Sequence, residues 1–357
     1  MTFTKAKPKK RTSEPGSPDF KPLWSPKHGV TQGLLKSFLT CREQTRLHHI
    51  VGWSLTVESV PLMFGSHFHD LTATLATDGV TIQGPGSTFH PHNVKLVEEF
   101  NAKSLREFRK QKPSPTIPEI DQAKSIHAQV AVVVKHYHHQ WSQVRAKWDW
   151  LSREQTFRVS STITHDSSNP LELRGRFDGV FRDDKAKLWL LETKTKGQID
   201  QKGLQGSLQF DLQTMLYCLA LKKLHGENPV GVVYDVVRRP QLRRGKDESL
   251  PTFCDRIDKD IRKNPKWYFH QWNVHLSEAD LNHWEVYTLR PMILDLIYWY
   301  EALKLHNFSP DTGITHHYLN DSALFTAWGR CDLFDLITKG KTYGLHRRKV
   351  IYPELDD

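Results

Sequence analysis

Two acids and one lysine have the spacing of a catalytic group. They lie in the stretch GRFDGVFRDDKAKLWLLETKTKG, residues 175–197. Apolar and β-branched runs on either side of an Asp-Asp-Lys turn predict a β-hairpin, with Asp178 on its first strand and Glu192 and Lys194 on its second. Because side chains alternate across a strand, Glu192 and Lys194 share one face and Thr193 points the other way. The hairpin therefore predicts two carboxylates and an ammonium group at the rim of a sheet.

This set of groups suits metal-dependent hydrolysis of a phosphodiester. Two carboxylates with nearby backbone carbonyls favour a hard divalent cation, Mg²⁺ or Mn²⁺, which takes its other ligands from water and a phosphate. Such a metal stabilises charge on the phosphate oxygens and lowers the pKa of bound water. Lys194 would orient the attacking water or stabilise the transition state. A charged outer face of an exposed hairpin is the alternative interpretation of Glu192 and Lys194.

The next segment favours the catalytic interpretation. Residues 207–224 have apolar positions at helical spacing, flanked by a polar stripe of Gln209, Gln213 and Tyr217 at i, i+4 and i+8. Gln213 and Tyr217 would therefore project together from one helix. An ordinary polar boundary of a helix is the alternative interpretation of this stripe.

Hydrophobic periodicity predicts the elements that position these residues. The first third is mainly helical and is followed by a sheet, with a proline at position 291 expected to kink or divide the last long helix. Helices are predicted over residues 31–49, 61–76, 94–109, 120–150, 207–224, 252–263 and from 277 onwards. Strands are predicted over residues 157–164, 171–182, 187–195, 230–237 and 268–276.

Composition limits the class of protein. The chain has 357 residues, 38% of them hydrophobic and 25% charged, and lacks an apolar run long enough for a membrane span. Its N-terminus lacks the apolar stretch of a secretory signal, so we expect a cytoplasmic protein without a membrane partner. The net charge is +10, and residues 1–28 carry half of that excess. Charge alone is therefore a weak argument for a nucleic-acid partner.

Four motifs, in order, resemble those of the PD-(D/E)XK nuclease superfamily, in particular its RecB-like exonuclease branch with the phage-type exonucleases. A Gly-x-x-x-His helix start, an isolated Asp, a Glu-x-Lys and a Gln-x-x-x-Tyr are the motifs of that branch. The matching residues are Gly65 and His69 in MFGSHFHDL, Asp178 in GRFDG, Glu192 and Lys194 in LLETKTKG, and Gln213 and Tyr217 in DLQTMLY.

The resemblance implies an α/β (α+β) fold with a restriction-endonuclease-like core. A central mixed β-sheet flanked by helices would be joined by a helical N-terminal region and by C-terminal helices. We expect a disordered basic tail over residues 1–29, the helical region over 30–150, the nuclease core over 151–276 and a helical region packed on the core over 277–357.

The resemblance also assigns roles to residues. It implies that Asp178, Glu192 and the Thr193 carbonyl bind the metal, with His69 as an additional ligand. Lys194 would activate or orient water, and Gln213 and Tyr217 would position Lys194 and the DNA backbone. Glu154, at the start of a predicted strand near this site, could assist.

Other metal centres fit the sequence less well. Some relatives hold an iron–sulfur cluster with one N-terminal cysteine and three near the C-terminus, but here only Cys41 and Cys331 fall in those regions. Two ligands are too few, so we expect no iron–sulfur cluster. The many histidines invite a zinc site, but no His/Cys set has convincing ligand spacing.

A basic segment follows the strand predicted over residues 230–237. We expect Arg238, Arg239, Arg243 and Arg244 to contact backbone phosphates of DNA, since they leave that strand beside the predicted site. A solvated basic loop is the alternative.

Three functions are compatible with these features. The leading one is an exonuclease that degrades linear DNA from an end, in phage or prophage recombination or in repair. A structure-selective or defence-related DNA endonuclease on the same core is the second. A catalytically silent DNA-binding scaffold is the third, although every catalytic position holds a competent residue. A single-strand annealing or recombination protein as partner and a homo-oligomer are options raised by analogy.

Overall fold

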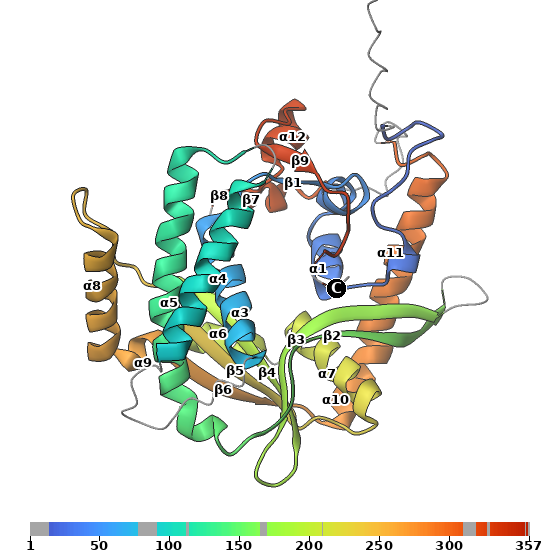
Figure 1. Ribbon diagram of the computed structural model, residues 1–357. Coiled ribbons are helices and arrows are strands. Elements are labelled where there is room, and N and C mark those ends of the chain that lie inside the picture. Colours follow the sequence, from blue (N-terminus) through green and yellow to red (C-terminus); the bar gives the residue numbers. More distant parts are fainter. Residues whose placement is uncertain are drawn as a thin grey trace, which may run out of the picture. The chain divides into compact units, whose positions relative to one another are not determined.

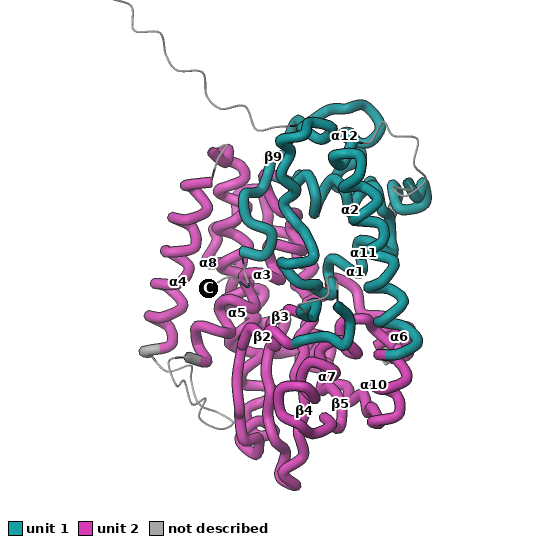
Figure 2. Tube along the Cα trace, turned by 90° about the vertical axis from the view of Figure 1, so that its right-hand side faces the viewer, with its two compact units in different colours: residues 1–55, 160–173, 286–357 teal, residues 56–159, 174–285 magenta. Residues whose placement is uncertain are grey.

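The computed structural model describes residues 14–77, 91–111, 114–164, 170–208, 210–309, 319–326, 329–353 and 355 (Figure 1). The chain forms two compact units, each assembled from separated stretches (Figure 2). The first unit comprises residues 1–55, 160–173 and 286–357, and the second comprises residues 56–159 and 174–285. The four successive regions expected from the sequence do not coincide with these interleaved units.

The centre of the second unit is a mixed sheet with the strand order β2-β3-β4-β5-β6. The β3–β4 and β5–β6 pairs are antiparallel, while β4 and β5 are parallel. Strand β5 is buried at every position, as expected for a strand covered on both faces. The strands are β2 (Asp149–Thr164), β3 (Pro170–Arg182), β4 (Leu188–Lys196), β5 (Gly231–Arg238) and β6 (Phe269–His275). Residues 160–173, at the tip of the β2–β3 hairpin, are assigned to the first unit.

Helices pack on both faces of this sheet. One group shares an apolar core with β5 and β6 and consists of α3 (Val60–Thr77), α4 (Pro91–Arg109), α5 (Ile117–Arg145), α8 (Leu250–Lys263) and α9 (Pro265–Tyr268) (Figure 1). Helix α7 (Leu212–His225) packs on β4 and β5, and α10 (Glu278–Trp284) packs on α7. The mixed sheet flanked by helices confirms the predicted fold class.

One predicted helix is divided in the structure. The segment expected to be continuous over residues 207–224 forms α6 (Gln201–Leu208) and α7. Asp211 starts α7 as its N-cap, because its side chain accepts hydrogen bonds from the backbone N–H groups of Gln213 and Thr214. Gly226, with φ +69°, ends the helix in the left-handed conformation that glycine adopts readily. Gln209 of the expected polar stripe lies outside the described residues.

The first unit combines N- and C-terminal segments. The rings of Phe38 and Trp299 pack with centroids 5.4 Å apart, and β1 pairs with β9. A π-helical turn over Glu285–Leu289 precedes Pro291, at the start of α11, so the last long helix is divided as predicted. The unit contains α1 (Gln32–Thr40), α2 (Arg42–Thr45), β1 (Trp53–Leu55), α11 (Arg290–Lys304), β7 (Phe325–Thr326), β8 (Gly329–Arg330), α12 (Phe334–Lys339) and β9 (Leu345–Arg347).

Part of the expected N-terminal tail is folded. The Trp24 side chain is fully buried, packs edge-on against Tyr300 and donates a hydrogen bond from its indole nitrogen to the Gly29 carbonyl. The expectation of disorder over residues 1–29 is therefore wrong for this part, which is held by buried aromatic contacts and by backbone hydrogen bonds from Leu23 and Trp24 to Ile50 and His49. Residues 1–13 lie outside the described residues.

Two further expectations concern membranes and cysteines. None of the described helices has both the length and the apolar character required to cross a bilayer. Cys41 and Cys331 belong to the first unit, whereas Cys218 and Cys254 are on α7 and α8 of the second. The expectation that the chain has no iron–sulfur cluster stays a prediction.

Candidate active site

Strand β4 and helix α7 bring Glu192, Lys194 and Gln213 together. The Lys194 ammonium donates a hydrogen bond of 2.7 Å to Glu192 Oε1, and Gln213 Nε2 donates one of the same length to that oxygen. The ammonium also donates to Gln213 Oε1. Glu192 is only 3% exposed. These three side chains are therefore fixed relative to one another, with the carboxylate buried and the ammonium partly exposed.

Asp178 lies beside this group on β3. The β3–β4 register pairs Gly179 with Leu191, so the next positions along the two strands are Asp178 and Glu192. Asp178 Oδ2 accepts a 2.7 Å hydrogen bond from the backbone N–H of Thr193. The peptide between Glu192 and Lys194 thus orients the second acid.

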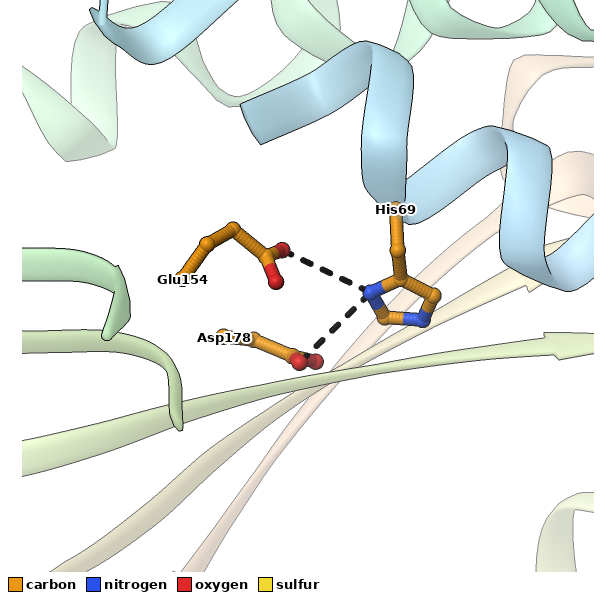
Figure 3. A group of neighbouring side chains, drawn as sticks. All are labelled: His69, Glu154 and Asp178. Carbon is orange, nitrogen blue, oxygen red and sulfur yellow. Dashed lines mark ion pairs between the residues drawn. The ribbon is translucent and has the colours of Figure 1, made fainter. Parts of the chain in front are cut away.

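Helix α3 contributes His69. Its Nδ1 lies 3.5 Å from Asp178 Oδ1 and 3.7 Å from Glu154 Oε1, and both carboxylates point at the imidazole in Figure 3. Each of these three residues offers a ligand atom, and the three atoms lie within 4.8 Å of one another. This spacing is close enough for one metal ion to reach all three.

Glu154 reaches the site through an irregularity in β2. Before this residue, alternate even-numbered positions are partly buried, and after it the buried positions are odd-numbered, beginning with Phe157 and Val159. Glu154 itself has φ +46°, which is uncommon for a residue other than glycine. A β-bulge has this signature, and bulges beside active sites redirect a side chain. The shift in alternation at Gln155 and Thr156 is the sequence signal for it.

Burial and mutual repulsion raise the proton affinity of the acids. Burial raises the pKa of Glu192 to about 7, with Asp178 adding to the rise and Lys194 opposing it. Burial likewise raises the pKa of Asp178, although His69 opposes the rise. Burial would lower the pKa of His69, but Asp178 and Glu154 outweigh it and raise that pKa to about 9. Without a metal, the protonated imidazole therefore balances this cluster of acids together with Lys194 and Arg176, and a metal ion held here would bind the neutral form of His69.

The donor set fits a hard divalent cation. Glu192 Oε2 is buried and has no hydrogen-bond partner among the described residues. Glu154 Oε2 lies 3.2 Å from Arg176 Nε, but not in hydrogen-bonding geometry. Buried carboxylate oxygens without donors are costly unless a cation faces them. Carboxylates and one imidazole are suitable ligands for Mn²⁺, and the carboxylates suit Mg²⁺.

Lys194 carries a positive charge in this site. Burial would lower the pKa of its ammonium, but Glu192 and Asp178 outweigh that effect and raise the pKa above its ordinary value. Lys194 is therefore a hydrogen-bond donor to Glu192 and Gln213 here.

Tyr217 lies on α7, one turn after Gln213. Its ring is 7% exposed and packs edge-on against Phe157 and Phe177, with centroids 5.3 and 5.7 Å away. Its expected role in positioning Lys194 and the DNA backbone stays a prediction. Tyr217 supports the strands beneath the site, and Gly175 fits here because an added Cβ would lie 2.9 Å from the Tyr217 ring and closer still to Phe157.

The four arginines expected on the DNA path separate into two kinds. Arg238 is the last residue of β5 and is 6% exposed, with its guanidinium 3.8 Å above the Trp267 ring and its Nε bonded to the Trp267 carbonyl. Its guanidinium is thus held against Trp267, and the expected phosphate contact stays a prediction. Arg239 is half-buried and bonds through its backbone N–H to Lys196, at the end of β4, while Arg243 and Arg244 are exposed.

The family assignment agrees with this geometry. The family model described as the PD-(D/E)XK nuclease superfamily matches residues 30–290 of the chain. The chain therefore belongs to the PD-(D/E)XK nuclease superfamily. Membership implies a nuclease that uses a divalent metal and acts on DNA. The match is to the superfamily, so the RecB-like branch and the phage-type exonuclease stay predictions.

Comparisons with individual proteins add less. No curated protein matches this chain. Among solved structures, 14 chains match. One is described as "Crystal structure of SSO0001" and has 14% sequence identity and a TM-score of 0.26, over 79% of this chain and 95% of that one.

Proposed function

We propose that this protein is an Mg²⁺- or Mn²⁺-dependent exonuclease that hydrolyses phosphodiester bonds of linear DNA. The observation that carries the proposal is the partly buried convergence of His69, Glu154 and Asp178 beside the Glu192–Lys194 pair, with two carboxylate oxygens left without a hydrogen-bond donor among the described residues. A group of this kind has a cation as its natural partner, and family membership supplies the chemistry.

We infer that Asp178, Glu192, Glu154 and His69 hold the metal, together with the Thr193 carbonyl. When bound, the ion would stabilise charge on the phosphate and supply a bound water of lowered pKa. Lys194 places a positive charge beside Glu192, where it can stabilise the developing negative charge or orient the water. Gln213 keeps that ammonium in place from α7.

The order of the motifs supports cleavage from an end. Gly65 and His69 at one turn of α3, with Gln213 and Tyr217 on α7, follow the pattern of the exonuclease branch that the sequence resembles. A role in phage recombination or repair, an annealing or recombination partner and a homo-oligomer are inferences from the same resemblance. We also propose a cytoplasmic location. Arg239, Arg243 and Arg244 are proposed to follow the DNA backbone.

The decisive experiment compares cleavage of different DNA substrates and tests whether it depends on Lys194. Labelled linear and covalently closed circular DNA, single- and double-stranded, are offered with Mg²⁺ or Mn²⁺ to the wild type, Lys194→Ala and the control Lys185→Ala. Lys185 is exposed in the hairpin turn at the other end of β3 and β4. We expect Lys194→Ala to lose activity about a hundredfold or more, as for other groups that stabilise charge in a transition state. Chelation of the metal should abolish cleavage by the wild type.

The outcomes separate the functions. Lysine-dependent degradation of linear DNA, with circles left intact, supports the exonuclease. Nicking of circular DNA would replace it with an endonuclease on the same core. Absence of lysine-dependent cleavage on every substrate would leave a DNA-binding scaffold.

A further inference from the structure

The face of β4 opposite Glu192 and Lys194 carries a buried polar row. In the β4–β5 register Thr193 is paired with Asp235, and in the β5–β6 register Asp235 is paired with Gln271. These three polar residues therefore lie side by side across three strands. Helix α5 contributes Tyr137 and Arg145 to the same face.

Asp235 is the centre of this row. Its side chain is fully buried. Oδ2 accepts hydrogen bonds from Arg145 and, at 2.8 Å, from the Tyr137 hydroxyl, while Oδ1 accepts one of 2.8 Å from Gln271 Nε2. A buried carboxylate is thus bonded at both oxygens and neutralised by one guanidinium, the arrangement that a buried charge requires.

Tyr137 connects Asp235 to Thr193. Its hydroxyl lies 3.2 Å from Thr193 Oγ1 and accepts a 2.6 Å hydrogen bond from Arg145. Because the single phenol proton is directed to Asp235, the Thr193 hydroxyl is the donor in the remaining contact. Burial raises the pKa of Tyr137 well above its ordinary value, so this phenol keeps its proton. The network therefore has a fixed direction from Thr193 through Tyr137 to Asp235.

Thr193 is held from both sides. Its hydroxyl is fastened to Tyr137 on one face, and its backbone N–H holds Asp178 Oδ2 at 2.7 Å. Its neighbours in the chain are Glu192 and Lys194, whose side chains lie on the other face. A displacement or rotation of the Thr193 peptide would move both acids relative to each other.

We propose that Tyr137 and Thr193 are positioning residues of the metal site, which set the spacing of Asp178 and Glu192 through the network anchored on Asp235 and Arg145. This inference rests on the proposed function. Hydrogen-bonding partners behind metal ligands commonly control metal affinity, and their loss weakens it by about 10- to 100-fold. A network with only a stabilising role would change the unfolding transition and leave metal affinity unchanged.

The test measures Mn²⁺ binding to the full chain by electron paramagnetic resonance, together with the Mg²⁺ concentration that gives half-maximal DNA cleavage. The variants are Tyr137→Phe and Thr193→Val, each of which removes one hydroxyl and little volume. The matched control is Thr195→Val, two residues further along the same face of β4 and outside the network. Circular dichroism and thermal unfolding show whether each variant is folded.

We expect the dissociation constant for Mn²⁺ to rise about tenfold in both network variants and to stay unchanged in Thr195→Val. The half-maximal Mg²⁺ concentration should rise in parallel, while cleavage at saturating Mg²⁺ falls less. If Tyr137→Phe does not fold, Thr193→Val decides the matter alone.

Two results would overturn the inference in different ways. Unchanged metal affinity in the folded network variants, with a wild type that binds Mn²⁺ and cleaves DNA, overturns the inference alone. The same applies if Thr195→Val weakens binding as much as they do. A wild type that neither binds Mn²⁺ nor cleaves DNA overturns the proposed function, and this inference with it.

Discussion

The two faces of β4 are formed by adjacent residues but differ in how completely their polar atoms are satisfied. On one face, Glu192 offers Oε2 without a donor among the described residues, and the nearby Asp178 carboxylate adds to the rise of its pKa. On the other face, both oxygens of Asp235 are bonded and one guanidinium neutralises its charge.

This difference suits one face to cation binding and the other to structural support. The network on the second face is rigid around Asp235, because moving this carboxylate breaks hydrogen bonds at both of its oxygens, although Arg145 Nε has no partner among the described residues. A buried acid without a full set of donors keeps capacity for a ligand, at a cost in stability that the rest of the fold must offset. Glu192 and Thr193 are neighbours on β4, but their side chains lie on opposite faces of the sheet. The rigid support at Thr193 is therefore one residue away from a carboxylate that can still bind a cation.

An acid-to-amide substitution should mainly reduce DNA cleavage on the Glu192 face and mainly reduce stability on the Asp235 face. Glu192→Gln is expected to reduce DNA cleavage by about a hundredfold or more, because a metal ligand is lost, while stability without metal changes by less than about 1 kcal/mol. Removing a carboxylate from a repelling cluster compensates for the partner that Lys194 loses. Asp235→Asn leaves Arg145 buried without a counter-charge and is expected to destabilise the fold by about 3–5 kcal/mol.

Urea unfolding without metal and single-turnover cleavage with Mg²⁺ measure the two effects on each variant. Activity is compared per mole of folded protein, so that loss of fold is not counted as loss of catalysis. The comparison of the two faces is mistaken if Glu192→Gln destabilises the chain as much as Asp235→Asn does.

Local periodicity was sufficient to predict one face of β4. Glu192 and Lys194 share a face because strand side chains alternate, whereas the place of Gln213 beside them was implied by the resemblance to the nuclease family. The hairpin turn determined which strand follows Asp178. These relations depend on residues close in sequence, which is why the sequence alone indicated the strands, helices and the group of side chains that this face holds.

The opposite face and Glu154 depend on relations that local patterns do not contain. Thr193 meets Asp235 only through the parallel register of two strands separated by a helix, and Tyr137 comes from a helix before the sheet. The direction of the Glu154 side chain depends on its own φ of +46°, at the point where the alternation of buried positions in β2 shifts. Arg238 was expected in a loop because β5 continues one residue beyond its apolar run.

Low pH should lower the free energy of unfolding through His138, on helix α5. Its side chain is 4% exposed, and burial, with Arg145 and Arg153, lowers its pKa to about 3. In the unfolded chain, where the pKa is near 6.5, the imidazole takes up a proton that the folded state refuses. The stability from neutral His138 is therefore present above pH 6.5 and is lost as the pH falls from there towards 3.

The measurement is the free energy of unfolding in urea between about pH 4 and 7. One such group contributes a slope of at most about 1.4 kcal/mol per pH unit. His138→Phe should lower this slope by up to that amount, because the apolar ring does not titrate. The exposed neighbour provides the control, and His139→Phe should keep the wild-type slope. If the free energy of unfolding has the same pH dependence in the wild type, His138→Phe and His139→Phe, His138 does not cause the loss of stability in acid.

The smallest effect is expected at the surface, where Arg243 and Arg244 differ from the buried Arg238. Exposed arginines on a DNA path act by releasing counterions, with a slope of about −0.9 in log affinity against log salt concentration for each phosphate contact. Arg243→Gln with Arg244→Gln should thus weaken DNA binding equally for all sequences and reduce that slope by about 2, with stability unchanged.

Fluorescence anisotropy at several KCl concentrations measures this slope, with Lys194→Ala in every protein to prevent cleavage and Lys185→Gln as the control for lost charge. Arg238→Gln should instead lower stability, because its guanidinium stacks on Trp267 and bonds to the Trp267 carbonyl. An unchanged slope in the double variant would mean that these arginines form a solvated loop. The DNA path would then have to be sought at Arg239, which bonds to Lys196 at the end of the strand that carries Lys194.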